Sequence, residues 1–403
     1  MKKNVLTPNR LINIVSLFFI LTTDAGFYSS EKFNGTVRLI MTTAAVGVLV
    51  ASRLQKTLLS NQFFGRLKRT FLYFILSLVM PLLYGRYNIK QMIIMLVAWC
   101  VGYLFTLFVS YEEFKDSFYL IIRFLAIYSL VTFVLSIIFP NLLDFLPYVE
   151  RDGTSYHNAV FSIVSDSTYV TRNFGIFWEP GAYSIYLNVA LYFELFENKF
   201  NSKRVVLLVV TILSTVSTLG IVCMAILFLA FLTTDDKVSS KRIKGFVFAG
   251  GAFALVFLFV FGGNFIYHVF NKLSFSGNTI NGSTEVRINA VIYPLKTFLS
   301  EPYLGVGYDK YLFIQERFCD NMATCTFINW LCLFGIIGGI IPIVGCLRFF
   351  TINSHKFFTN FALFIFTMLL FSTENFIIVA FIYILIFFGY NKRSEKNLLR
   401  KMV

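Results

Sequence analysis

Apolar runs close to the length of a membrane-spanning helix recur along this chain of 403 residues. A bilayer core of about 30 Å needs about 20 mainly apolar residues in each crossing helix. The composition agrees, because 57% of the residues are hydrophobic and only 14% are charged. We therefore expect an all-α polytopic membrane protein, with residues 1–403 forming one integral membrane domain.

The hydropathy pattern predicts about twelve transmembrane helices. The candidate spans are residues 11–27, 37–52, 70–85, 91–110, 118–139, 179–197, 205–217, 219–234, 243–262, 327–350, 357–371 and 375–390. We expect the first to be an uncleaved helix, because no signal-peptidase-type site follows it. The run 205–234 is long for one span, and Ser214–Gly220 in its middle favours a break, so we divide it in two.

The distribution of Lys and Arg among the predicted loops sets the orientation. With the N-terminus in the cytoplasm, roughly two basic residues lie inside for each one outside, as the positive-inside rule requires. Reading 205–234 as a single span would place the basic segment 237–244 outside. The net charge of +14 is explained by these short loops and by contact with anionic membrane lipids, so no nucleic-acid partner is expected. Both termini are predicted to be cytoplasmic.

Two long polar loops, residues 140–178 and 263–326, then fall on the same outer face of the membrane. Loops of this length in a compact protein commonly bind or catalyse. The first re-enters the membrane through RNFGIFWEPGAY, Arg172–Tyr183. An ionised side chain in hydrocarbon costs about 2.5–3.5 kcal/mol on insertion scales, so Arg172 and Glu179 at this border are candidate functional residues.

The chemistry of the two loops suits a phosphorylated substrate. Arg172 from the first loop and Arg287 from the second could hold a diphosphate, because guanidinium groups bind phosphate oxygens in a bidentate geometry. A carboxylate beside them could take a proton from a hydroxyl group. The three histidines are scattered, and no HExxH, CxxC or P-loop motif is present. We therefore predict neither a metal site nor a cofactor.

Each of these residues also has a structural interpretation. Arg172 could anchor the chain at the lipid interface by reaching the head groups. Glu179 followed by Pro180 is typical of a helix N-terminus, where a carboxylate favours the helix dipole. Trp178 could belong to an interfacial aromatic belt. Arg287 could be an ordinary solvated loop charge.

Two pairings stay open at this level. Arg123 lies within a predicted span and could pair with Glu194, with Glu374 or with a substrate. Cys319 and Cys325 lie in the outer loop, where an oxidising compartment would permit a disulfide, although two free thiols are equally consistent with the sequence.

Several segments together resemble one enzyme family. Residues Arg172–Gly181 resemble the signature of O-antigen and capsule polymerases of the Wzy type, within the O-antigen ligase/polymerase superfamily. The other matching segments lie within about 170–340: Ser214–Gly220 resembles the "S-x-x-G" helix pair, Arg287 with Pro302–Tyr308 the "R…P-x-x-G-V-G" element, and Asn329 with Leu333–Gly338 the start of the last outer-face helix.

The resemblance implies a glycosyltransferase of lipopolysaccharide or capsule biosynthesis. It would polymerise undecaprenyl-diphosphate-linked oligosaccharide repeat units at the periplasmic face of the bacterial inner membrane, with a chain-length regulator as a further partner. It implies that Arg172 and Arg287 hold the diphosphate. Glu179 would activate the acceptor hydroxyl or orient Arg172, and Trp178, Tyr308 and Asn329 would contact the substrate.

Two other functions remain as alternatives. An O-antigen ligase would resemble this chain, but ligases carry a His-Asn pair before the helix that begins here near Phe327, where this chain has Thr324-Cys325-Thr326. A lipid-linked oligosaccharide flippase would also have about twelve spans. Long loops and the lack of a broken-helix pair in each half count against that transporter. A purely structural scaffold would explain neither the two arginines nor Glu179.

Overall fold

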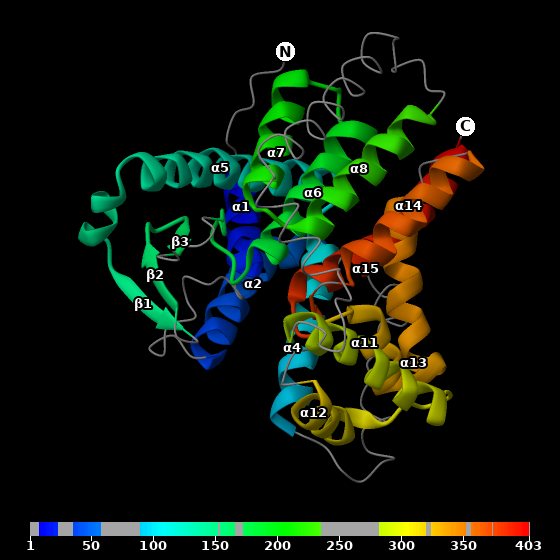
Figure 1. Ribbon diagram of the computed structural model, residues 1–403. Helices are drawn as coiled ribbons and strands as arrows, with labels where there is room; N and C mark the ends of the chain where they lie inside the picture. Colours follow the sequence, from blue (N-terminus) through cyan, green and yellow to red (C-terminus); the bar gives the residue numbers. More distant parts are fainter. Residues whose placement is uncertain are drawn as a thin grey trace. The chain divides into compact units, whose positions relative to one another are not determined.

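The computed structural model describes residues 8–22, 35–57, 89–151, 154–165, 172–234, 282–319, 324–351, 356–372 and 374–402. Most of these residues are helical (Figure 1). The chain divides into two compact units. The first draws on Met1–Phe74, Ile93–Gly220 and Ile378–Val403, and the second on Ile75–Met92 and Ile221–Ile377.

The elements of the first unit are α1 (Pro8–Thr22), α2 (Gly35–Thr57), α4 (Ile89–Phe108), α5 (Tyr111–Ile138), the 3₁₀ helix η2 (Pro140–Phe145), β1 (Tyr148–Arg151), β2 (Thr154–Asn158), β3 (Ile163–Ser165), α6 (Pro180–Phe196), α7 (Ser202–Ser214) and α15 (Ala380–Met402). The second unit contains α11 (Gly282–Ser300), α12 (Gly307–Phe318), α13 (Thr326–Thr351) and α14 (Phe357–Leu370). Two of the described helices cross the division: the first residues of α4, up to Met92, belong to the second unit, and α8 (Thr218–Leu232) begins in the first unit and continues in the second.

The predicted spans 70–85 and 243–262 lie outside the described residues, and each of the others overlaps a helix, with ends that differ by up to about ten residues. The predicted break within 205–234 is confirmed, because α7 ends at Ser214 and α8 begins at Thr218. In the described part of the chain two helices, α5 and α13, are long and apolar enough to cross a membrane by length and composition. This agrees with a helical membrane protein, while the total of about twelve spans stays a prediction.

Neither long segment is an irregular loop. The first contains η2 and a three-stranded antiparallel sheet in the order β1-β2-β3, so the all-α expectation missed a small β element. The second contains α11 and α12, where a loop was expected. Their buried side chains explain why they fold: Ala290, Ile314 and Cys319 form a core with Tyr293, whose ring stacks on Phe318 at 4.6 Å between centroids.

Aromatic side chains form the core of the first unit. Phe118 of α5 stacks on Phe381 of α15 with 5.3 Å between ring centroids and 7° between planes. Phe114 stacks on Phe388 at 5.0 Å, and Phe193 of α6 meets both α5 rings edge-on. Many of the Phe residues thus join α5, α6 and α15. Such ring pairs stabilise the packing beyond the contribution of their buried apolar area.

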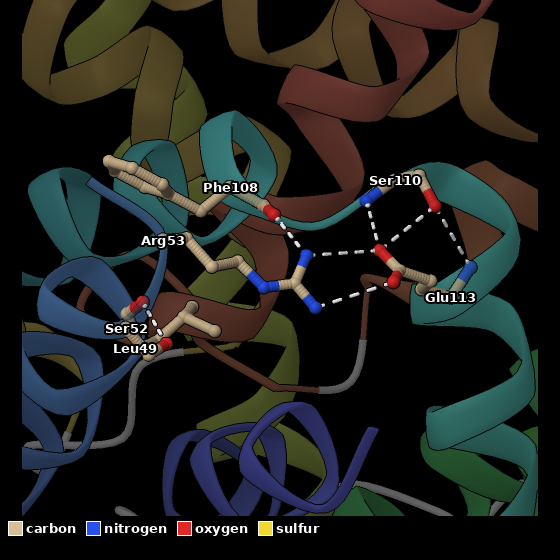
Figure 2. A network of polar contacts seen from close by, with 6 residues as sticks. All are labelled: Leu49, Ser52, Arg53, Phe108, Ser110 and Glu113. Carbon is tan, nitrogen blue, oxygen red and sulfur yellow. Dashed lines mark hydrogen bonds and ion pairs between the residues drawn. The ribbon is translucent and has the colours of Figure 1, made fainter. Parts of the chain in front are cut away.

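A bidentate ion pair joins α2 to the connection between α4 and α5. Figure 2 shows the Arg53 guanidinium between the carbonyl group of Phe108 and the carboxylate of Glu113. Nη1 donates to the Phe108 oxygen at 2.6 Å, and Nη1 and Nη2 each lie 3.3 Å from a Glu113 oxygen. Glu113 also completes a capping box with Ser110 at the start of α5. The Arg53 side chain is mostly buried and Glu113 is half-exposed.

Candidate functional site

The segment predicted to be the site, Arg172–Glu179, forms an ordered connection into α6. Arg172 donates from Nε to the carbonyl oxygen of Thr215 at 3.2 Å and from Nη2 to that of Val216 at 3.4 Å. These carbonyls lie in the break between α7 and α8, where the C-terminus of α7 lacks intrahelical partners. A cation there is favoured by the helix dipole. Arg172 therefore braces the break, and Val216 adopts a left-handed conformation at φ 50° beside it.

Asn173 holds the same segment in place. Its backbone N–H donates to the Ser214 carbonyl at 3.0 Å, and its amide nitrogen donates to the hydroxyls of Ser129 and Ser214 at 3.1 and 3.0 Å. Its amide oxygen accepts from the Gly175 N–H at 2.9 Å. Ser129 also shares a hydrogen bond with the Tyr183 hydroxyl at 2.9 Å. These side chains are buried and satisfy one another, which rigidifies the connection.

Sequence reasoning missed this polar cluster of Asn173, Ser129 and Tyr183. Ser129 lies inside an apolar span, so its hydroxyl looks like an isolated polar residue until α5 and α6 are brought together. Gly175 is the one residue of the motif whose type indicates a tightly packed turn. It adopts φ +55°, and a Cβ there would lie 2.7 Å from the Tyr183 ring, so the position requires glycine.

Glu179 occupies the N-cap of α6, followed by Pro180 at the first helical position. The predicted helix start is thus confirmed, but the carboxylate makes no capping hydrogen bond. The Glu179 side chain is exposed instead. Trp178 beside it is partly buried and meets the Phe177 ring edge-on at 6.4 Å. The carboxylate is therefore held at a helix N-terminus without being used to close that terminus.

The N-terminus of α8 approaches the second and third turns of α6 next to this connection. The Ser184 hydroxyl of α6 lies 3.3 Å from that of Ser217, which in turn accepts from the Gly220 N–H at 3.3 Å. The Asn188 amide donates to the Gly220 carbonyl at 3.0 Å. A Cβ on Gly220 would lie 2.5 Å from Ser184, so this small residue permits the approach. The positive dipole end of α8 consequently lies against the second and third turns of α6.

The second unit contains another helix break. Gly335 interrupts α13 with φ 60° and ψ −168°, and the loop Pro302–Val306 fills the gap with backbone hydrogen bonds. Val306 N–H donates to the Cys332 carbonyl at 2.9 Å, and Ile336 N–H donates to the Pro302 carbonyl at 2.7 Å. The two segments that carry the resemblance in this unit therefore contact each other directly. The interruption of α13 at Gly335 was not predicted from the sequence.

Tyr308 and Asn329, the candidate substrate residues of the second unit, are both buried. Tyr308 lies in the first turn of α12 and meets Tyr311 edge-on at 6.3 Å. Burial raises the pKa of the Tyr311 phenol above its ordinary value, so that hydroxyl stays protonated. Asn329 donates from its amide to the Thr324 carbonyl at 2.6 Å, and its buried amide oxygen has no hydrogen-bond partner among the described residues.

The N-terminus of α13 is fixed to the segment between α14 and α15. Thr326 N–H donates to the Phe371 carbonyl at 2.9 Å, and its hydroxyl donates to the Glu374 carbonyl at 2.6 Å. That hydroxyl also accepts from the Phe376 N–H at 3.0 Å. Cys325, one residue earlier, adopts φ 54°, and burial raises the pKa of its thiol. This turn, where ligases carry a His-Asn pair, is rigid and carries no histidine.

Arg287 lies on α11 rather than in a loop, and its side chain falls outside the described part of the chain. Arg172, Trp178 and Glu179 belong to the first unit, whereas Arg287 belongs to the second. The convergence of the two arginines on one diphosphate stays a prediction.

The two open pairings are answered in part. The Glu194 carboxylate, which is fully buried, pairs with Arg204 at 3.8 Å, so Arg204 takes the place offered to Arg123. The Arg123 side chain is exposed on α5. Cys319 and Cys325 are buried thiols that are not joined in a disulfide, and the Cys319 sulfur donates to the Asn289 carbonyl at 3.6 Å.

No group of three His, Cys, Asp or Glu side chains gathers within the described ranges. No protein-family model and no curated protein sequence matches the chain. The function is therefore argued from the residues and their geometry.

Proposed function

We propose that this chain is a membrane glycosyltransferase that polymerises polyprenyl-diphosphate-linked oligosaccharide repeat units, as a Wzy-type O-antigen or capsule polymerase does. One observation carries the proposal: the connection that bears Arg172 and Glu179 leads into the N-terminus of α6, and Arg172 ties it to the break that precedes the N-terminus of α8. Helix N-termini attract phosphate groups through their dipoles and their unpaired N–H groups. An exposed carboxylate stands at the same place.

Arg172 supports this proposal in two ways. Its hydrogen bonds to Thr215 and Val216 offset the negative end of α7, which directly precedes the positive end of α8. The same two bonds fix the plane of the guanidinium, and a fixed cation needs little reorganisation when charge develops on a leaving diphosphate. Arg287 is proposed to complete the diphosphate site.

The proposed reaction is a displacement at an anomeric carbon. The hydroxyl oxygen of the acceptor sugar attacks that carbon, and the bond to the diphosphate oxygen breaks. The electron pair of this bond leaves with the polyprenyl diphosphate. The hydroxyl proton passes to the Glu179 carboxylate, whose exposure leaves it accessible to an acceptor. Trp178, which is partly exposed, is proposed to contact the sugars, whereas Tyr308 and Asn329 are buried and are assigned no direct contact. No metal is assigned to the reaction.

The proposed location is the bacterial inner membrane, with several spans and both termini in the cytoplasm. The apolar helices α5 and α13 support a membrane location, as does the recurrence of apolar runs in the sequence. The site would then face the periplasm, where lipid-linked repeat units and a chain-length regulator are expected.

A lipid-linked oligosaccharide transporter is the second candidate, because helix breaks occur in both units. The α7–α8 break and the Gly335 break in α13 are the kind of discontinuous helices that transporters use at their binding sites. The exposed carboxylate of Glu179 favours the enzyme, since a transporter needs no base at that position.

The deciding experiment uses the purified full chain in liposomes that contain a defined lipid-linked repeat unit. A polymerase yields products at multiples of the repeat, with one polyprenyl diphosphate released for each new glycosidic bond. Protein-free liposomes are the control. Passage of the repeat unit across the bilayer with no new glycosidic bond would replace the proposal with the transporter.

A further inference from the structure

The chain leaves α5 through η2, a short helix with an exposed apolar row. In a 3₁₀ helix the side chains at positions i and i+3 lie one above the other. Leu142 and Phe145 share this spacing and are 49% and 84% exposed. Phe139 before the helix and Tyr148 after it continue the three-residue spacing and are 54% and 70% exposed. Four large apolar or aromatic side chains thus point away from the protein core.

A polar row accompanies the apolar one. Asn141 and Asp144 are also three residues apart, and both are exposed. Because the two rows are offset by one position, they lie on different sides of the same turn. The segment Phe139–Tyr148 is therefore amphipathic, with no buried residue in η2 itself.

The apolar row continues a longer exposed stripe on α5. Residues at alternating spacings of four and three lie on one face of an α-helix. The members of this stripe are Leu120, Phe124, Ile127, Val131, Val134 and Ile138, each more than 40% exposed. Since α5 is one of the two helices apolar and long enough to cross a membrane, this face is the one that lipid would cover.

The length of α5 places η2 at the edge of the bilayer. The acidic and basic residues of its first turns end at Asp116, and the remainder, Ser117–Ile138, carries one charged residue, Arg123. At 1.5 Å per residue this part spans about 33 Å, close to the hydrocarbon thickness of about 30 Å. Arg123, near the charged end, is long enough for its guanidinium to reach toward that end.

We propose that Phe139–Tyr148 is an interfacial segment that inserts its apolar row into the head-group boundary of the lipid bilayer, while Asn141 and Asp144 face water. Aromatic side chains such as Phe and Tyr favour this boundary. The proposal rests on the membrane location proposed above, but not on glycosyl transfer.

The interfacial segment would fix the height of the candidate site above the membrane. β1 begins at Tyr148, and the sheet ends at β3, whose Ile163 N–H donates to the Gly175 carbonyl at 2.7 Å. Gly175 lies inside the Arg172–Glu179 connection. In Figure 1 the sheet lies beside the end of α5 that leads into it. Anchoring this segment therefore holds the connection at the level where a lipid diphosphate would lie.

The test attaches an environment-sensitive fluorophore to single introduced cysteines in the full chain, reconstituted in phosphatidylglycerol-containing nanodiscs with spin-labelled lipid. Phe145→Cys probes the apolar row, and Asp144→Cys is the matched control on the polar row. Val131→Cys on the α5 stripe tests the membrane location itself. Wild-type protein carried through the same labelling gives the background, because five of its six thiols are buried.

We expect the label at position 145 to be quenched by spin-labelled lipid about twofold more strongly than the label at 144, from an insertion depth of about 5–10 Å. The label at 131 should be quenched as well. Strong quenching at 131 with equally weak quenching at 144 and 145 would overturn the proposal that Phe139–Tyr148 enters the lipid boundary. The assignment of α5 as a membrane-spanning helix would then still stand. Protein-concentration-dependent shielding at 145 without lipid quenching would mean that a second copy covers this face, which also overturns it. No quenching at any position would reject the membrane location.

Discussion

The Nε atom of Arg172 donates a hydrogen bond to the carbonyl oxygen of Thr215 across 3.2 Å. This bond ties the connection into α6 to the break between α7 and α8. The proposed diphosphate ligand and this structural brace thus depend on the same side chain. Substitutions of Arg172 must be chosen so that a loss of folding can be told from a loss of catalysis.

Arg172→Lys keeps the positive charge but loses the planar fork that binds diphosphate. We expect the elongation rate to fall about tenfold or more, a change of about 1.4 kcal/mol in activation free energy. Arg172→Ala should also lower the free energy of unfolding by about 1.5–3 kcal/mol, because charged hydrogen bonds to two carbonyls are lost. The rate in liposomes and thermal unfolding in detergent measure the two effects.

Arg204→Lys is the control for the two Arg172 variants, because Arg204 contacts Glu194 at the opposite end of α7. It should leave the elongation rate unchanged. A wild-type rate in Arg172→Lys would remove Arg172 from the diphosphate site.

Glu179→Gln should slow elongation while the lipid-linked donor still binds, because the amide cannot accept the hydroxyl proton. The carboxylate makes no capping bond, so the free energy of unfolding should change by less than about 0.5 kcal/mol. Rates and donor affinity are measured in parallel, with Asp144→Asn as the control for loss of an exposed acid. Equal loss of binding and rate would make Glu179 a structural residue.

Gly305→Ala tests the contact between the Pro302–Val306 loop and the break in α13. Gly305 adopts φ +72°, and a Cβ there would lie 2.5 Å from the Gly335 nitrogen. The left-handed conformation and the clash should together lower the free energy of unfolding by about 2 kcal/mol or more. Gly47→Ala in α2 is the matched control, since a Cβ there meets nothing within 4 Å.

The control should stabilise the helix slightly, by about 0.5–1 kcal/mol. Thermal unfolding of both variants gives the comparison. Equal stability of the two alanine variants would mean that the Gly335 break is not held by this loop.

The Arg53–Glu113 ion pair should show a measurable coupling in a double-mutant cycle of Arg53→Met and Glu113→Gln. The pair is bidentate but Glu113 is half-exposed, so we expect about 1 kcal/mol. The exposed Lys310–Glu301 pair should give less than about 0.5 kcal/mol. If the coupling energy of Arg53–Glu113 is no larger than that of Lys310–Glu301, burial of Arg53 does not strengthen the ion pair.

Much of the helical framework could be predicted because most helices carry their own apolar run, whereas α11 and α12, which lack one, were expected to be a loop. The break at 215–217 could be predicted too, since Ser214–Gly220 combines small and polar residues that end a helix locally. The Gly335 break could not, because its backbone groups are satisfied by Pro302–Val306, about 30 residues earlier in the chain. The sheet of β1–β3 was missed because its strands are short and lack a regular apolar alternation.

The candidate site was only partly predictable for the same reason. Arg172 and Glu179 stand out because charge is rare at a membrane border. Asn173 and Ser129 carry no such signal, since their role depends on a contact between the connection and α5. The pairing of Glu194 with Arg204 could not be predicted, because Arg204 approaches Glu194 only after the turn into α7.

The most direct test of the polymerase proposal is the surface polysaccharide of a strain that lacks this chain, compared on a gel with wild type and with strains that carry Arg172→Lys or Arg287→Ala. The proposal predicts a product stalled at a single repeat unit on the lipid core, because attachment continues without polymerisation. Full-length polysaccharide in the deletion strain, or single repeats trapped on the cytoplasmic face of the membrane, would contradict it.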